Sequence, residues 1–238
     1  MDTSIVLMLL ALFTSTVTAI TGVGGGMMLV AVLSSFLAPS VLIPVHGATQ
    51  LSSNISRAIL GYKEIYYQAV LKYIIGSLLG VSISYNFLLH LSFTCIPLFI
   101  GVYIILSFWS KSLSHLFEKL ESYFLLGSLQ SGLSLVVGAT GAMAMPALAK
   151  DCKDANQIVV TLAAFAFISH LLKIIVFIAL GFAFFEYIDI MLYMIFGAVV
   201  GSYVGTRIRN RVDAKKLLIF MKILVTIFAL KGIVRVFV

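Results

Sequence analysis

The sequence contains few charged residues, and this scarcity excludes most classes of protein. Only 11% of its 238 residues are charged and 61% are hydrophobic. Soluble domains carry about 25% charged and about 45–50% apolar residues, so a soluble enzyme, a nucleic-acid-binding domain and a secreted scaffold are excluded. The charges present are mostly basic, with 16 Lys and Arg against 9 Asp and Glu. In a membrane protein this excess indicates cytoplasmic loops, and we expect no nucleic-acid partner.

Cysteine and metal-binding patterns are also scarce. Cys95 and Cys152 are far apart, and neither belongs to a CxxC or Cys/His pattern. The sequence has no HExxH motif and no paired carboxylates in its apolar regions. We therefore expect no metal, no cofactor and no enzymatic activity.

The N-terminal region has only part of the pattern of a signal peptide. Residues 5–19 are apolar, and residues 17–19 faintly resemble a cleavage site. The preceding residues include Asp2 and no Lys or Arg, whereas a signal peptide begins with positive charge. We expect this segment to remain in the mature protein.

The apolar residues form runs that are long enough to cross a bilayer, which takes about 20 helical residues. Two of these regions, 5–38 and 122–149, are too long for one helix and are broken by glycine-rich sequence at 22–26 and 138–142. Broken backbone is tolerated at membrane depth where it is buried or lines a cavity. The remaining runs predict six transmembrane helices, at 41–61, 66–89, 92–110, 157–183, 187–206 and 217–234.

The two halves of the chain resemble each other. A shift of 116 residues, without a gap, pairs Gly22 with Gly138, Gly25 with Gly141, Met27 with Met143, Ala31 with Ala147, Ser53 with Ser169, Asn54 with His170 and Arg57 with Lys173. A shift of 121 residues pairs Gly76 and Gly80 with Gly197 and Gly201. We predict a first repeat at 1–110, a linker at 111–121 and a second repeat at 122–238.

The positions of Lys and Arg predict the topology. If each glycine-broken region crosses the membrane once, the loop cations divide between the two sides. If each is a re-entrant hairpin, Arg235 lies on one side and ten cations lie on the other: Lys63, Lys111, Lys119, Lys150, Lys153, Arg207, Arg209, Arg211, Lys215 and Lys216. The positive-inside rule favours the hairpins.

Each repeat is then a hairpin followed by three crossings. The fold class is an all-α membrane protein with two inverted repeats, and both termini lie outside. The linker 111–121 is cytoplasmic, and so is the basic run 207–216, which we expect to contact anionic lipid.

The glycine-broken hairpins are the first part of the candidate site. A helix that begins inside the membrane presents free N–H groups and the positive end of its dipole, which favours anions. We expect such helices to begin near Met27 and Met143. The alternative is that the glycines only allow helices to pack closely.

Polar residues on the following helices are the second part. In the first half, spacings of three and four place six polar residues on a single helix face: His46, Thr49, Gln50, Ser53, Asn54 and Arg57. We expect such a polar face to line an interior cavity. The second half is sparser, with Thr161, Ser169, His170 and Lys173. The alternative for Arg57 is that its side chain extends to the nearby cytoplasmic surface.

Lys173 lies about ten residues from the nearer end of its span, or roughly 15 Å. No carboxylate lies deep within any span, so we expect a transported anion to be its counter-ion. His46 and His170 are the candidates for proton coupling, or alternatively packing residues. The predicted substrate-binding residues are Gly24, Gly25, Gly26, Met27, Thr49, Gln50, Ser53, Asn54, Arg57, Thr140, Gly141, Ala142, Met143, Ser169, His170 and Lys173.

Two motifs connect the chain to a known family. The sequences TGVGGGMMLV at 21–30 and GATGAMAMPAL at 138–148, with the small-residue helix near the end of each half, resemble the sulfite exporter TauE/SafE family. The resemblance covers nearly the whole chain. It implies a duplicated transporter of the bacterial inner membrane that exports small sulfur-containing anions, such as sulfite or organosulfonates. An anion channel or a transporter of another small anion is the alternative, and the oligomeric state is open.

Overall fold

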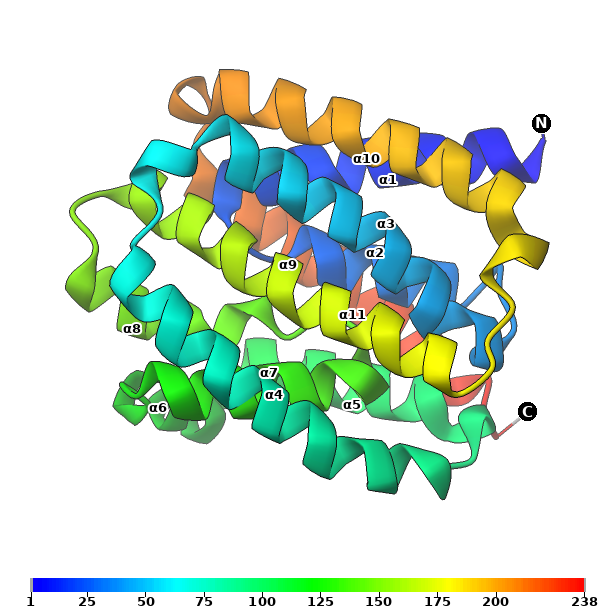
Figure 1. The fold of residues 1–238 in the computed structure, drawn as a ribbon. Helices are drawn as coiled ribbons and strands as arrows, with labels where there is room; N and C mark the ends of the chain where they lie inside the picture. The colour runs from blue at the N-terminus through cyan, green and yellow to red at the C-terminus, as the bar shows by residue number, and fades with distance from the viewer. Residues whose placement is uncertain (1, 238) are drawn as a thin grey trace.

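The computed structural model describes residues 2–237, which contain helices and no strands. The long helices lie side by side along one common direction (Figure 1). In chain order the elements are α1 (Thr3–Thr21), α2 (Gly25–Leu33), α3 (Pro39–Leu60), η1 (Tyr62–Glu64), α4 (Tyr67–Leu89), η2 (Phe93–Cys95), α5 (Ile96–Trp109), α6 (Lys111–Lys119), α7 (Tyr123–Val137), η3 (Gly141–Ala144), α8 (Met145–Asp151), α9 (Ala155–Ala179), η4 (Phe184–Tyr187), α10 (Ile188–Ile208), η5 (Arg209–Arg211) and α11 (Ala214–Val234).

Local sequence explains where many helices begin. Five helices begin after a Ser or Asp whose side-chain oxygen accepts a hydrogen bond from a backbone N–H of the first turn: Asp2 before α1, Ser110 before α6, Ser122 before α7, Asp154 before α9 and Asp213 before α11. Proline at the first positions of α3, α5 and α8 supplies a backbone already suited to a helix start.

The described helices agree in part with the six predicted spans. Five are long and apolar enough to cross a membrane, namely α1, α4, α9, α10 with its flanking turns, and α11; a sixth is the bent pair of α5 and α6 counted as one. The helix α3 covers the predicted span 41–61 and is 22 residues long, but six polar residues of the predicted stripe are buried in it. The polar face of α3 therefore points into the protein and does not contact lipid.

The first glycine-broken region, predicted as a hairpin at 5–38, has two arms of very different length. Its first arm, α1, has 19 residues, or about 28 Å, which is long enough to cross the hydrocarbon layer. Its returning helix, α2, has only 9 residues. In the second region the arms α7 and α8 have 15 and 7 residues. The chain turns back in both regions, but with arms of unequal length.

Two helix pairs join the halves of the chain through glycine. A Cβ on Gly76 of α4 would lie 1.8 Å from the carbonyl oxygen of Phe124 in α7, and one on Gly197 of α10 would lie 2.2 Å from that of Met8 in α1. Gly80 and Gly201 make the same kind of contact one turn further along each pair. The backbones touch, so no other residue fits at these positions.

The two pairs are equivalent in sequence as well as in geometry. The shift of 121 residues relates Gly76 to Gly197, and the shift of 116 residues relates Met8 to Phe124. Within each pair the contacts advance in the same direction along both chains, so the helices run parallel. Each pair takes one helix from each half, and the halves are therefore packed into one another.

The two ends of the helix bundle differ in charge. The N- and C-termini lie at one end, and α6 and α8 lie at the other (Figure 1). The helix directions place the turns at 61–66, 152–154 and 209–213 at this second end as well. All ten loop cations that were predicted to share one side therefore lie there.

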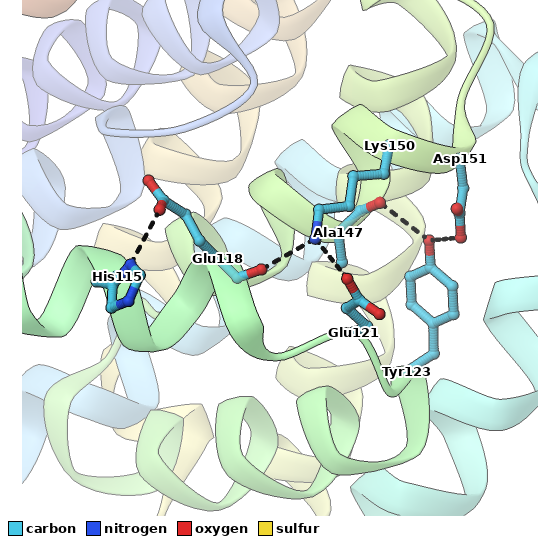
Figure 2. A network of polar contacts seen from close by, with 7 residues as sticks. All are labelled: His115, Glu118, Glu121, Tyr123, Ala147, Lys150 and Asp151. Carbon is cyan, nitrogen blue, oxygen red and sulfur yellow. Dashed lines mark hydrogen bonds and ion pairs between the residues drawn. The ribbon is translucent and has the colours of Figure 1, made fainter.

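The linker between the halves forms the short helix α6, which is tied to the second glycine-broken region (Figure 2). Lys150 Nζ donates to Glu121 Oε1 at 2.5 Å and to the carbonyl oxygen of Glu118 at 3.1 Å. Tyr123 Oη donates to Asp151 Oδ2 at 2.7 Å. The Lys150 and Glu121 side chains are more than half exposed, so this ion pair contributes about 0–1 kcal/mol.

Candidate functional site

Both glycine-broken segments line one cavity. The segment at 22–27 contributes Gly22, Val23, Gly24, Gly26 and Met27, and the segment at 138–142 contributes all five of its residues. The cavity volume is about 50 Å³. One water needs roughly 10–15 Å³ on this measure, so the space suits a ligand of a few heavy atoms.

The cavity lies where equivalent parts of the two halves meet. The shift of 116 residues relates most of its lining in seven pairs: Thr18 with Ser134, Gly22 with Gly138, Val23 with Ala139, Gly24 with Thr140, Gly26 with Ala142, Gln50 with Ala166 and Asn54 with His170. The two halves therefore contribute corresponding backbone segments to the lining of this cavity.

Glycine conformation creates the two breaks. Gly22, Gly24 and Gly138 have φ values of 82°, 95° and 82°, in a region that other residues rarely adopt. The helix α2 begins at Gly25, two residues before Met27 and directly after Gly24 with its positive φ; Gly25 packs directly on the backbone of Thr14. In the second half the turn η3 comes first, and α8 begins at Met145 rather than near Met143.

Hydrogen bonds hold the second segment in place and leave some lining groups free. Gln130 Nε2 donates to the carbonyl oxygen of Thr140 at 2.7 Å, and Thr140 Oγ1 donates to the carbonyl oxygen of Gln130 at 2.9 Å. On α3, Asn54 Nδ2 donates to the carbonyl oxygen of Gln50 at 2.6 Å. Gln50 Nε2 is buried without a hydrogen-bond partner among residues 2–237. It is therefore a donor that a ligand in the cavity can satisfy.

Lys173 and His46 support the glycine segments from behind the cavity lining. Lys173 Nζ donates to the carbonyl oxygen of Gly138 at 2.6 Å and lies 3.2 Å from His170 Nδ1. His46 Nε2 lies 3.0 Å from the carbonyl oxygen of Gly26. The His46 and His170 rings meet edge to face, with centroids 5.6 Å apart. His170 lines the cavity, so a polar chain connects the cavity to the buried lysine.

The predicted serines lie in two equivalent clusters that pack helices together. Ser53 Oγ is 3.0 Å from Ser15 Oγ and 2.9 Å from Ser202 Oγ. Ser169 Oγ is 2.8 Å from both Ser131 Oγ and Tyr73 Oη. Ser169 also lines the cavity, whereas Ser53 does not.

The structure divides the predicted site residues into two groups. Those that line the cavity are Gly24, Gly26, Met27, Gln50, Asn54, Thr140, Gly141, Ala142, Ser169 and His170. Those that lie outside its lining are Gly25, Thr49, Ser53, Arg57, Met143 and Lys173. Thr49, for example, is occupied within its own helix, because its hydroxyl donates to the carbonyl oxygen of Val45 in α3.

Sequence reasoning missed several lining residues. Thr18 and Ser134 are related by the shift of 116 residues, and extending the repeat comparison into the first arms would have found them. Gln130 also lies on a first arm. Tyr73 and Phe165 stack with ring centroids 4.0 Å apart, and nothing in their sequence context predicts a place beside the cavity.

The interpretation of Arg209 as part of a surface lipid anchor is wrong. Its side chain is only 8% exposed. Its Nε donates to the carbonyl oxygen of Ala19 at 2.6 Å, and its Nη1 donates to Asn156 Oδ1. Arg57 is 2% exposed and donates from Nη2 to Asn54 Oδ1, so it does not reach the surface either.

The fold and the site define the protein as a multi-pass helical membrane protein with a small cavity between two glycine-broken segments, lined by both apolar and polar residues. The cavity lining contains no carboxylate, and the ion pairs of residues 2–237 all lie on exposed side chains. The model of the sulfite exporter TauE/SafE family matches residues 7–232, nearly the whole chain. The chain belongs to this family, which confirms the resemblance of its glycine motifs and makes it a membrane transport protein. Neither a curated protein nor a solved structure matches the chain.

Proposed function

We propose that this protein is a secondary transporter that exports small sulfur-containing anions, such as sulfite or an organosulfonate, by alternating access around the cavity. The observation that carries the proposal is that both glycine-broken segments line this one cavity. Its family supplies the class of substrate. The small volume suits a compact anion.

The charges beside the cavity support an anionic substrate. Lys173 is fully buried and has no carboxylate partner among residues 2–237, and the same holds for Arg57 at 2% exposure. Buried cations are costly unless an opposite charge compensates them. Gln50 Nε2 and the backbone N–H groups of the glycine segments are neutral donors for the oxygens of the anion.

We further propose that the two repeats are inverted, with both termini outside and the basic end of the bundle in the cytoplasm of a bacterial inner membrane. The recurring glycine pairs of α1 with α10 and α4 with α7 support the repeat. The concentration of Lys and Arg at one end supports the orientation, because cytoplasmic loops retain positive charge.

For the coupling ion, we propose protons that are carried by His170 and His46. Their rings are in contact, and His170 faces the cavity directly. With no carboxylate in the cavity lining, His170 and its contact partner His46 are the imidazole groups available beside the cavity to carry a proton. A His170→Asn variant that still transports sulfite down its gradient, but no longer responds to a proton gradient, is the expected result.

Reconstitution in liposomes tests the proposed function. We expect saturable efflux of radiolabelled sulfite, and counterflow of label against unlabelled sulfite on the opposite side. Taurine, sulfoacetate, thiosulfate and sulfate added as competitors identify the substrate. Flux that does not saturate and shows no counterflow would indicate a channel, and the absence of flux for all of these anions contradicts the proposal.

A further inference from the structure

Arg57 and Arg209 come together beside the end of α1, outside the cavity lining. The helices α1, α3 and α10 run in the same direction, and hydrogen bonds join Ser53 on α3 to Ser15 and Ser202 on the other two. One helical turn further along, Arg57 is level with Ala19, to whose carbonyl oxygen Arg209 donates. Arg57 and Arg209 therefore lie at the same level of the bundle, on elements that pack side by side against α1.

This place contains several buried hydrogen-bond donors without partners. Arg57 Nε and Nη1, Arg209 Nη2 and Thr206 Oγ1 have none among residues 2–237. Thr206 lies one turn after Ser202 on α10, level with Arg57. Neither arginine forms an ion pair with a described residue. Buried polar groups are normally hydrogen-bonded, and buried charges are normally paired with an opposite charge.

We propose that Arg57, Arg209 and Thr206 form a second anion-binding site, which takes a small oxyanion with three or four oxygens on sulfur or phosphorus. Guanidinium groups bind such oxygens through paired N–H donors in a fixed plane. Arg57 lies on α3, Thr206 on the last turn of α10 and Arg209 on η5. Asn54 and Ala19 accept one hydrogen bond each from the two arginine side chains. An oxyanion here satisfies the free donors and compensates the charge.

The second site adjoins the cavity on the side of the basic end. Asn54 accepts a hydrogen bond from Arg57 and also lines the cavity, and Thr18 of the lining directly precedes Ala19. An anion bound by the arginines is therefore separated from the cavity only by residues such as Asn54, and it lies on the cytoplasmic side of the cavity in the proposed orientation. This place on the transport path rests on the proposed function, whereas the binding itself does not.

The number of bound anions tests the second site. The experiment is equilibrium dialysis of radiolabelled sulfate and sulfite against the full chain, purified in detergent and freed of phospholipid. Arg57→Gln and Arg209→Gln are compared with Arg211→Gln, which removes an exposed arginine from the same turn η5. We expect each of the first two variants to bind one anion fewer per chain than Arg211→Gln. Equal numbers in all three variants overturn the proposal.

A second measurement does not depend on the folding of a variant. An arginine-specific dicarbonyl reagent is applied to the wild-type protein with and without sulfate, and the modified residues are identified by mass spectrometry. Both side chains are buried, so the reagent reaches them only when the bundle opens locally. We expect a bound sulfate to slow their modification at least about fivefold and to leave that of the exposed Arg211 unchanged. Unchanged rates at Arg57 and Arg209 overturn the proposal, and so does protection by phosphatidylglycerol but not by sulfate.

The liposome experiment separates this proposal from the proposed function. If the wild-type protein moves no anion but both arginines still bind sulfate, the second site stands and the transport function fails. If the protein exports sulfite and the arginine variants keep the full number of bound anions, the transport function stands and the second site fails.

Discussion

Lys173 donates a hydrogen bond of 2.6 Å to the carbonyl oxygen of Gly138, the glycine at which the second broken segment leaves α7. A buried cation thus fixes the backbone that lines the cavity and also contributes positive potential beside it. The two effects act together, because the hydrogen bond to Gly138 orients the segment and also holds the charge next to a residue that lines the cavity.

Replacing this lysine should reduce anion binding more than it reduces stability. We expect Lys173→Met to weaken sulfite binding about tenfold to hundredfold, the loss that corresponds to one charge-assisted hydrogen bond of about 1.5–3 kcal/mol. The measurement is titration of monodisperse purified protein. Lys222→Met is the matched control, because Lys222 lies over the Trp109 ring and away from the cavity. Wild-type affinity in Lys173→Met would show that this lysine is purely structural.

Filling the cavity should abolish binding without unfolding the protein. A Cβ on Gly141 meets no atom within 4 Å, and Gly141 lines a cavity of only about 50 Å³. We therefore expect Gly141→Leu to occupy this space, with sulfite binding lost in titration and the melting temperature within a few degrees of wild type. Undiminished binding would mean that the anion binds elsewhere.

The glycine contact between α4 and α7 should be essential for folding. A Cβ on Gly76 would lie 1.8 Å from the carbonyl oxygen of Phe124, so the helices must separate to admit even alanine. We expect Gly76→Ala to lower the melting temperature by several degrees or to prevent recovery of monodisperse protein. Gly141→Ala, which adds the same methyl group in open space, serves as the control and should behave as wild type.

The two native cysteines report the orientation. Cys95 ends η2, at the end of the bundle that carries the termini, and Cys152 follows α8 at the basic end. With both termini outside, a membrane-impermeant maleimide should label Cys95 in spheroplasts and label Cys152 only after permeabilisation. Single Cys→Ser variants assign each signal. The reverse pattern would contradict the proposed orientation and the inverted hairpins.

The labelling of Cys152 should depend steeply on pH. Burial, together with the nearby Asp151 and Asp154 carboxylates, raises the pKa of the Cys152 thiol to about 11. The thiolate is the reactive form, so its fraction and the labelling rate should rise about tenfold per pH unit between pH 7 and pH 10. Asp154→Asn retains a residue able to cap α9 but removes one charge, and should increase the rate at a fixed pH. A rate that does not change with pH contradicts this prediction.

Much of the architecture can be read from local sequence. Apolar runs, glycine breaks and cap residues act over a few neighbouring positions, so composition and spacing were enough to predict the helices, the broken segments and the repeated pattern. The unequal arms of the broken regions were not predicted, although Asp2 at the start of α1 and Gly22 at its end are local signals that bound this helix.

The candidate site illustrates the same division residue by residue. The sequence by itself determined that one face of α3 is polar and buried, since spacings of three and four place its residues together. Only the tertiary structure decided that Gln50 and Asn54 face the cavity while Ser53 packs against α1 and α10. The burial of Arg209 likewise could not be predicted from the basic sequence at 207–216, because its partners Ala19 and Asn156 are distant in the chain. Side-chain direction and partner choice depend on neighbours that folding alone brings together, whereas helix formation depends on residues that are already adjacent.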